Sequence, residues 1–328
     1  MVKQKDEVFR FQNKENRLDL SPAKIESIIF SNKAMISTQA VSLALEHNID
    51  LIFLDQYGFP NGRVWFSKMG STALIRRRQI DAAENRTGLT LVLDMVKKKI
   101  DNQIQFLKKL KYARPEKKDV FKDPIETITD CRNSLSKDFT GMDEARSRIM
   151  GYEGTAGRAY FTCISKLMPR KFRFKGRSRR PAEDPFNAVL NYCYGVLYSR
   201  VEKACIIAGL DPFVGFMHTD NYNKKSMVFD LIEPFRIFAE QTAVYFFTGK
   251  KAKETYFDIK EHSCSLNDKG KPVIIDALNR HLEEKVRYKN RNVKRKHIIS
   301  HEAHRLANLL LEKDDSPIRS NWLKIKEF

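Results

Sequence analysis

The segment Ala73–Leu110, ALIRRRQIDAAENRTGLTLVLDMVKKKIDNQIQFLKKL, marks a change in the character of the chain. Its apolar residues recur at steps of three and four positions with few helix-breaking residues, which is the period of an α-helix. We therefore predict one or two long helices over this segment. Its first part, residues 73–84, is predicted to connect an N-terminal domain to a larger helical one.

Before this segment the sequence favours short strands. An apolar run rich in β-branched residues lies at Ile25–Phe30, a second apolar run at Asp50–Asp55 and a third at Val64–Phe66. Between the first two, Ser37–Glu46 opens with a capping serine and continues with apolar residues at helical spacing. Residues 1–72 are therefore predicted to form a small, β-rich α+β domain.

After this segment, helical periodicity dominates. We predict a helical domain over residues 85–328, so the fold class is α+β, with a small β-rich domain followed by a larger all-α domain. The polar stretch 113–123 is predicted to be a loop, and 249–272 a break with weak strand character. The predicted helices are Glu144–Leu167, Asn187–Ala208, Leu231–Thr248, Val273–Leu282 and Lys296–Leu311.

The charge of the chain points to a polyanionic partner. Sixty Lys and Arg against 41 Asp and Glu give a formal net charge of +19, and each cation placed at a phosphate releases a counterion. The 42% of hydrophobic residues are enough for a core, which excludes a disordered basic protein. A basic enzyme with a small anionic substrate stays possible. A membrane surface is disfavoured, because no strongly amphipathic basic helix is present.

Cysteine usage and the first residues predict a cytoplasmic protein. The five cysteines form no CxxC pair, which is typical of reduced thiols. The first residues are polar and do not resemble a signal peptide, and no apolar run approaches the ~20 residues of a membrane span. The cysteines are Cys131, Cys163, Cys193, Cys205 and Cys264.

Two basic segments are candidates for nucleic-acid binding. Arg170–Arg180, RKFRFKGRSRR, interleaves basic residues with Phe172 and Phe174, a pattern suited to phosphate contact and base stacking. Lys285–Lys296, KVRYKNRNVKRK, has a similar composition. Each run taken alone could equally be a solvated charged surface. The residues predicted to contact DNA in the first segment are Arg170, Lys171, Arg173, Arg177, Arg179 and Arg180.

Four residues could hold a metal ion that acts on phosphodiesters. Such an ion requires carboxylate oxygens, sometimes with an imidazole. Glu153 lies among small residues in GYEGTAGRAYF, which would permit close helix approach, and His218 precedes a segment that carries Asp230 and Glu233. The last two are three residues apart, which would place them on one face of a helix. Taken singly, Asp230 could instead be a helix cap and His218 a core histidine.

Several other chemistries are excluded by the spacing of their motifs. His297, His301 and His304 would share a helix face, but the zinc-protease pattern that begins at His301 requires histidine at position 305, which is arginine. The glycines of 151–157 do not match a dinucleotide-binding fingerprint. No phosphate-binding loop with Lys-Ser/Thr and no serine-hydrolase elbow occur in the sequence.

Taken together, these segments resemble the CRISPR-associated adaptation integrase family from about Ile25 to Leu311. The resemblance is carried by three blocks that follow in the family's order and spacing. They are GYEGTAGRAYF, DPFNAVLNYCYGVLYSRVEKACIIAGLDPFVGFMH and SMVFDLIEPFR. The early segment ISTQAVSLALEHNIDLIFLDQYGFPNGRV is similar to the family's N-terminal β domain, which would serve in dimerisation or DNA binding.

The resemblance implies roles for individual residues. Glu153, His218 and Glu233 fall where the family binds Mg²⁺ or Mn²⁺, and Asp230 supports this set or joins it as a ligand. Arg158 falls where the family meets DNA beside the metal. The residues implied to line the site are Asn187, Asn191 and Tyr198.

The implied activity is that of an endonuclease and integrase in prokaryotic spacer acquisition. It joins the 3′-hydroxyl ends of a short duplex DNA, the prespacer, to a CRISPR repeat beside the leader. Family members act as homodimers, and a small companion adaptation protein bridges two dimers. Two alternatives are a transposon-type integrase of the same fold and a non-catalytic DNA-binding scaffold.

Overall fold

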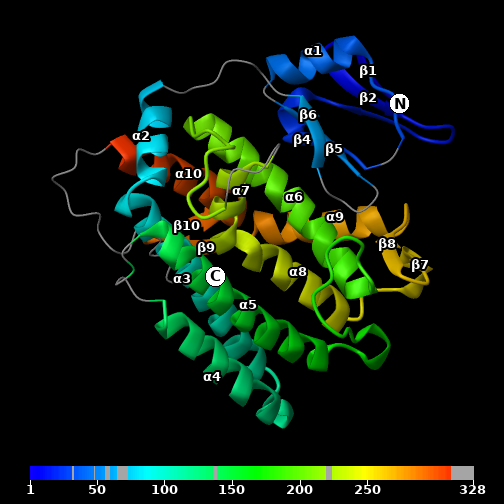
Figure 1. Ribbon diagram of the computed structural model, residues 1–328. Coiled ribbons are helices and arrows are strands. Elements are labelled where there is room, and N and C mark those ends of the chain that lie inside the picture. The colour runs from blue at the N-terminus through cyan, green and yellow to red at the C-terminus, as the bar shows by residue number, and fades with distance from the viewer. Residues whose placement is uncertain are drawn as a thin grey trace. The chain divides into compact units, whose positions relative to one another are not determined.

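The computed structural model divides into two compact units, residues 1–69 and 70–328 (Figure 1). The first unit is rich in strands and the second is mainly helical, which confirms the predicted fold class. The structure describes residues 1–31, 33–47, 49–55, 60–64, 73–135, 139, 141–218 and 224–311.

The first unit contains two three-stranded sheets. The sequence predicted the second sheet and missed the first. In the first sheet, antiparallel and in the order β1-β2-β3, the strands are Val2–Lys5, Val8–Gln12 and Arg17–Leu20. In the second sheet, in the order β4-β5-β6, they are Ser27–Phe30, Asp50–Leu54 and Pro60–Val64. The third predicted strand, 64–66, shares only Val64 with β6, and residues 65 and 66 lie outside the described residues.

Helix α1, Thr38–Glu46, connects β4 to β5. These two strands are parallel, and a parallel pair needs a crossover connection. As the sequence predicted, Ser37 caps the helix, because its hydroxyl accepts a hydrogen bond from the Ala40 backbone N–H at 3.2 Å. Phe9, Leu43 and Leu51 are buried in one core, which packs both sheets with the helix.

The second unit is a set of helices around a buried central one. In chain order the helices are α2 (Ala73–Ala83), α3 (Arg86–Tyr112), α4 (Asp119–Asn133), α5 (Met142–Leu167), α6 (Pro185–Ala208), α7 (Ser226–Leu231), α8 (Arg236–Thr248), α9 (Gly270–Glu283) and α10 (Arg295–Leu311). The single turn η4, Glu233–Phe235, joins α7 to α8. None of the described helices is long and apolar enough to cross a membrane. The five cysteines are buried free thiols.

Helix α6 forms the centre of this unit. It packs against both α8 and α10 and is buried along nearly its whole length (Figure 1). Its ends follow local rules: Asp184 caps the start by accepting from the Asn187 N–H at 2.8 Å, and Gly209 ends the helix with a left-handed φ of 87°. Polar residues on such a helix must find partners inside the protein.

Two predictions about connections are wrong. Residues 73–84 were predicted as a linker, but 73–83 form α2, which packs on α3 and α10 within the second unit. Ile75, Gln79 and Ala82 form its buried face, hidden in the sequence by the neighbouring arginine run. The predicted loop 113–123 contains the start of α4, whose buried Phe121 secures it to the core.

Two β-hairpins complete the second unit. The first pairs β7 (Phe257–Lys260) with β8 (Ser263–Leu266) and lies in the stretch where the sequence indicated weak strand character. The second pairs β9 (Lys285–Tyr288) with β10 (Arg291–Lys294) and lies in the second basic segment, where no strand was predicted.

Gln79 on α2 secures the chain that leads to His218, and its removal should destabilise the fold. Its buried amide donates to the carbonyls of Asp211 and Val214 at 2.9 and 2.7 Å and accepts from the Asp211 N–H at 2.8 Å. Gln79→Leu would leave these backbone groups unpaired, which should lower the free energy of unfolding by roughly 2–4 kcal/mol. Denaturant unfolding measures this, with the exposed Gln105→Leu on α3 as the control. Equal stability of the two variants would contradict the role of Gln79.

Candidate active site

Glu153 and Glu233 converge on one ammonium group. Lys99 of α3 forms an ion pair with Glu233 Oε2 of η4 at 2.6 Å and a second with Glu153 Oε1 of α5. The side chains of Lys99 and Glu233 are only 12% and 4% exposed, so water screens their attraction weakly. Three elements that are remote in the sequence therefore meet at a single positive charge.

Arg236 supplies a second positive charge to Glu233. From the start of α8, its guanidinium donates to Glu233 Oε1 at 2.8 Å. Burial alone would raise the pKa of the Glu233 carboxyl, but the charges of Arg236 and Lys99 hold this pKa well below its usual range. Asn102, one turn after Lys99 on α3, also fixes the turn by donating to the Pro234 carbonyl at 2.8 Å. Glu233 is thus an ionised carboxylate in a rigid setting.

Asp230 orients the imidazole of His218. One carboxylate oxygen lies 2.5 Å from His218 Nδ1, and the other accepts from the backbone N–H groups of Phe216 and Met217 at 2.6 and 3.0 Å. Both oxygens of Asp230 are therefore engaged. An imidazole that donates from Nδ1 to a carboxylate leaves the lone pair of Nε2 available for a metal or a proton.

Asp230 and Glu233 do not act as a pair on one helix face. Helix α7 ends at Leu231, and Glu233 begins the separate turn η4, so the two carboxylates contact different partners. Asp230 lies inside α7 and does not cap a helix. It accepts backbone hydrogen bonds from the loop that holds His218, so its role in the described structure is to position that histidine.

The predicted metal ligands are not arranged around one common point in the described structure. Within the described part of the chain, no three His, Cys, Asp or Glu side chains are arranged to hold a metal ion. Lys99 instead joins Glu153 to Glu233, and His218 is paired with Asp230. The donors nevertheless suit a hard divalent cation: two carboxylates already stabilise one compact positive charge, and an imidazole is oriented by a carboxylate.

The glycines around Glu153 leave one side of α5 open. They were expected to allow close helix approach, but that expectation is wrong. A Cβ atom built at Gly151 or Gly157 meets nothing within 4 Å, and one at Gly154 meets only the end of the Arg158 side chain at 3.8 Å. Arg158 is itself exposed one turn after Glu153. Small residues here therefore provide room beside the carboxylate for a bound molecule.

Asn187 and Asn191 of α6 hold the first basic segment, residues 170–180, which follows α5 and is called the basic loop from here on. Both side-chain oxygens accept from the guanidinium of Arg177, at 2.8 Å in the case of Asn187. Their amide groups donate to the carbonyls of Gly176 and Arg179 at 2.8 and 2.7 Å. The structure therefore places these two asparagines beneath the loop, while the ring of Tyr198 packs against Phe229, which also lies beside His218.

Tyr194 connects the basic loop to the carboxylates. The guanidinium groups of Arg177 and Arg236 lie 5.5 and 4.9 Å from the centre of its ring, within the range of cation–π attraction. Its hydroxyl donates to the buried Glu240 at 2.8 Å. Because Arg236 also binds Glu233, a chain of direct contacts runs from the loop to the site where Glu153 and Glu233 meet.

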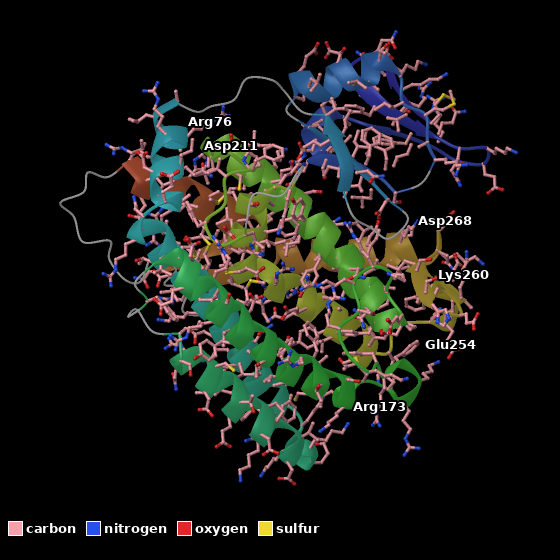
Figure 2. The ribbon with its side chains drawn as sticks, viewed as in Figure 1. Arg76, Arg173, Asp211, Glu254, Lys260 and Asp268 are labelled. Carbon is pink, nitrogen blue, oxygen red and sulfur yellow. The ribbon has the colours of Figure 1, made fainter. Side chains whose placement is uncertain are left out.

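The basic loop presents arginines to solvent and buries its aromatic rings. Phe172 and Phe174 were expected to stack on nucleic-acid bases, but both are buried, and Phe174 stacks on Phe186 with ring centres 4.3 Å apart. That part of the prediction is wrong, because the rings complete the core between α5, α6 and α8. The exposed cations of the segment are Arg170, Lys171, Arg173, Lys175, Arg179 and Arg180, of which Figure 2 labels Arg173.

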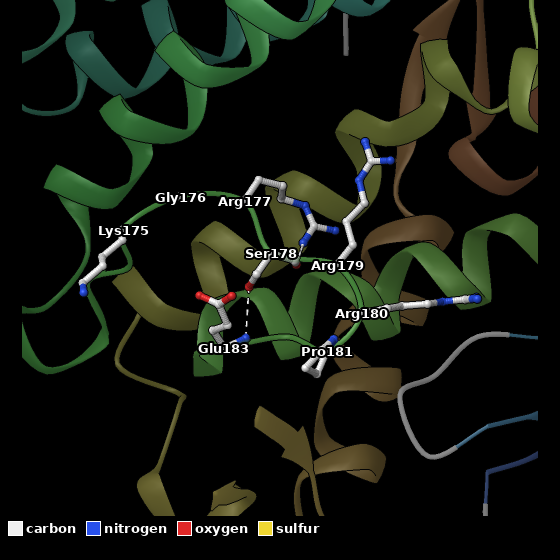
Figure 3. Close-up of a pocket in the computed structure, with 8 residues that line it drawn as sticks. All are labelled: Lys175, Gly176, Arg177, Ser178, Arg179, Arg180, Pro181 and Glu183. Carbon is white, nitrogen blue, oxygen red and sulfur yellow. Dashed lines mark hydrogen bonds between the residues drawn. The ribbon is translucent and has the colours of Figure 1, made fainter. Parts of the chain in front are cut away.

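An open pocket of about 390 Å³ lies at the turn of this loop. Figure 3 shows that Arg177 reaches inward, whereas Arg179 and Arg180 extend away from the loop backbone. Glu183 closes the turn, since its backbone N–H donates to the Ser178 hydroxyl at 3.0 Å. Lys171, at the start of the segment, forms an exposed ion pair with Glu254 at 2.8 Å.

Comparison with known proteins identifies the family. The model of the family described as CRISPR associated protein Cas1 matches residues 1–280. The chain belongs to the Cas1 family. A CRISPR-associated endonuclease Cas1 from Archaeoglobus fulgidus is 32% identical over 290 residues, which cover 85% of this chain and 84% of the relative. A Cas1 protein from Methanobrevibacter ruminantium is 30% identical over 270 residues, 81% of this chain and 80% of that one.

Solved structures share the fold at lower identity. A casposase bound to integration product aligns with a TM-score of 0.80 and 22% identity, covering 100% of this chain and 93% of the other. A Cas1 protein from Thermotoga maritima aligns with a TM-score of 0.79 and 19% identity over 95% of both chains. The two-unit architecture is therefore that of Cas1 proteins and of a casposase.

Two residues of this Cas1 site were missed from the sequence. Lys99 was not singled out, because nothing in the sequence connects it to Glu153, 54 positions later. Arg236 lies in the quoted block SMVFDLIEPFR, three residues after Glu233, and that spacing was a usable signal for an ion pair.

Lys99→Met should show whether the ammonium and a metal ion compete. Without the ammonium, the metal-free variant should be less stable by about 3 kcal/mol or more, because Glu233 loses a buried partner. Mn²⁺ should then bind the variant more tightly and raise its melting temperature by more than it raises that of the parent. Thermal unfolding with and without Mn²⁺, together with calorimetric titration, measures both effects.

The matched control is Lys108→Met, an exposed lysine on the same helix. It should change neither the stability of the metal-free protein nor the response to Mn²⁺. The competition would be refuted if Mn²⁺ stabilised the parent protein at least as much as it stabilised the Lys99 variant.

Proposed function

We propose that this Cas1 chain is a divalent-metal-dependent DNA endonuclease and integrase of CRISPR spacer acquisition. It joins the 3′-hydroxyl ends of a short duplex to a CRISPR repeat, and with water in place of the hydroxyl it cleaves DNA. The observation that carries the proposal is the convergence of Glu153 and Glu233 on one buried cation position, beside a face of α5 that is open.

Glu153, Glu233 and His218 are the residues that would hold Mg²⁺ or Mn²⁺, with the ion in place of the Lys99 ammonium. Such an ion, when bound, stabilises the charge that develops on a phosphate and activates an attacking hydroxyl. The chain's own residues prepare the site: Arg236 keeps Glu233 ionised, and Asp230 holds His218 through Nδ1. Pre-oriented groups of this kind need little rearrangement during the reaction.

The basic loop is the proposed contact for the DNA backbone. Its exposed arginines, with Arg158 near Glu153, would neutralise phosphates and position the duplex without reading its bases. Arg177 would act differently, because it is held by Asn187 and Asn191 and supports the loop from inside. Lys171 could exchange Glu254 for a phosphate, since exposed ion pairs are weak.

The proposed partners follow from the family. The duplex prespacer and the repeat with its leader are the DNA substrates, in the cytoplasm of a prokaryote. We propose a homodimer, with residues 1–72 contributing to dimerisation or DNA binding and a small companion adaptation protein bridging two dimers. A solved neighbour described as a Cas6-RT-Cas1–Cas2 complex, aligned over 94% of this chain with a TM-score of 0.77, is consistent with a partner of this kind.

Glu153→Ala should abolish joining and leave duplex binding largely intact. The substitution removes a charged ligand but no residue of the basic loop, so joining should fall by at least about 10³-fold. Incubation of a duplex bearing free 3′-hydroxyls with repeat DNA and Mn²⁺, with and without chelator, measures the joined product, and fluorescence anisotropy measures binding. Glu126→Ala, an exposed carboxylate on α4, is the control. Parental joining by the Glu153 variant would show that the site is assigned wrongly.

Binding of duplex DNA should weaken steeply with salt, and the basic loop should account for part of that dependence. Replacing Arg173, Arg179 and Arg180 by Gln should reduce the slope of log affinity against log salt by about 2–3, equally for unrelated sequences. Anisotropy titrations at several salt concentrations test this. A slope unchanged from that of the parent protein would remove the loop from the DNA-binding surface.

A further inference from the structure

The second basic segment forms a tight hairpin that the proposed active site does not use. Strands β9 and β10 pair in register, with Tyr288 opposite Arg291 and Val286 opposite Val293. Lys289 and Asn290 form the two-residue connection, with φ angles of 46° and 66°. Two positive φ angles at the centre are typical of the turn that matches the twist of a hairpin, so this ribbon has a defined shape.

The hairpin is attached firmly to α10. Tyr288 is buried, and its hydroxyl donates to Glu302, a fully buried carboxylate of α10. The ammonium of Lys289 contacts the same carboxylate at 3.0 Å, and the Tyr288 ring stacks with His301 at a ring-centre distance of 6.2 Å. Because one face of the ribbon is held in this way, the backbone positions from which the side chains of its other face project are fixed.

The outer face of the hairpin is basic. Side chains alternate along a strand, so Lys285 and Arg287 lie on the face opposite to Tyr288, together with their cross-strand partners Lys294 and Asn292. Lys285 and Lys294 are direct cross-strand neighbours of like charge, an arrangement that costs stability unless an anion lies near. The ammonium of Lys294 forms an ion pair with Glu283 at 2.7 Å.

Two cations of the outer face remain available for a partner. Lys285 and Arg287 are exposed, and neither of them has an acidic partner among the described residues. Asn292, opposite Arg287, is exposed as well and offers both a donor and an acceptor. A polyanion would satisfy both charges at once.

The chemistry of this face favours duplex DNA over other polyanions. A single strand needs aromatic side chains on which its bases stack, but Tyr288, the ring of the ribbon, is buried. A protein partner needs apolar anchors, whereas Val286 and Val293 lie on the face that carries Tyr288. A two-stranded ribbon, in contrast, has the width that the major groove of B-form DNA admits.

We propose that the outer face of the β9–β10 hairpin is a second binding surface for duplex DNA, apart in sequence from the basic loop. The proposal rests on the proposed function only in taking DNA as the substrate. Lys285 and Arg287 would contact phosphates along the groove, while Asn292 would face the base edges or the sugar-phosphate backbone.

The test replaces Lys285 and Arg287 together by Gln. The matched control replaces two exposed lysines that have no acidic partner among the described residues, Lys118 just before α4 and Lys122 within it, so that the net charge falls equally. Anisotropy with a fluorescent duplex and with a single strand is measured at several salt concentrations. The hairpin variant should bind duplex about tenfold more weakly, with the salt slope reduced by about 2, and the control should change little.

An independent measurement uses the unmodified protein. Acetylation of surface lysines, read by mass spectrometry, should be suppressed at Lys285 by duplex DNA but unchanged at Lys118. Equal losses in the hairpin and control variants, an equal loss for single strands, or no protection of Lys285 would each overturn the proposal. If Glu153→Ala still abolishes joining while the hairpin variant binds normally, the hairpin surface fails and the proposed function stands.

Discussion

Two ionised carboxylates lie close together inside a protein only at a large cost in free energy unless a positive charge accompanies them. In this chain the ammonium of Lys99 meets that requirement for Glu153 and Glu233, and Arg236 adds a second charge to Glu233. The constraint ties α3, α5 and the turn η4 to one point. A divalent ion suits the same position because it carries the charge that these carboxylates need.

The need to pair buried charged and polar groups also links this site to the basic loop through a series of contacts. Arg236 lies over the ring of Tyr194, Arg177 lies over it as well, and Arg177 is bound by Asn187 and Asn191. Each of these groups is on or beside α6, a helix so thoroughly buried that its polar side chains must pair inside the protein. The basic loop therefore takes its shape from the core, and its exposed arginines are placed by residues that do not themselves reach solvent.

The local sequence was enough to predict those helices and strands that depend on a pattern of a few neighbouring residues. The helix capped by Ser37, the helix that begins after Asp184 and the strands at 27–30 and 50–54 were all predictable, because capping and periodicity act over a few residues. A pattern that fits two different structures led to a wrong prediction. The rings of Phe172 and Phe174 alternate with cations as stacking residues would, yet both rings are buried and pack against other phenylalanines of the core.

The sequence by itself determined the class of fold and, through three blocks in order, the family. Its charge of +19 predicted a polyanionic partner, and the blocks marked Glu153 and Glu233 as candidates for the site. Only the tertiary structure decided which cation holds Glu153 and Glu233, that Asp230 serves His218, and that Asn187 and Asn191 support a loop. These facts depend on contacts between residues up to 134 positions apart, such as Lys99 and Glu233. Charge and spacing along a chain do not specify such distances, because packing of the helices sets them.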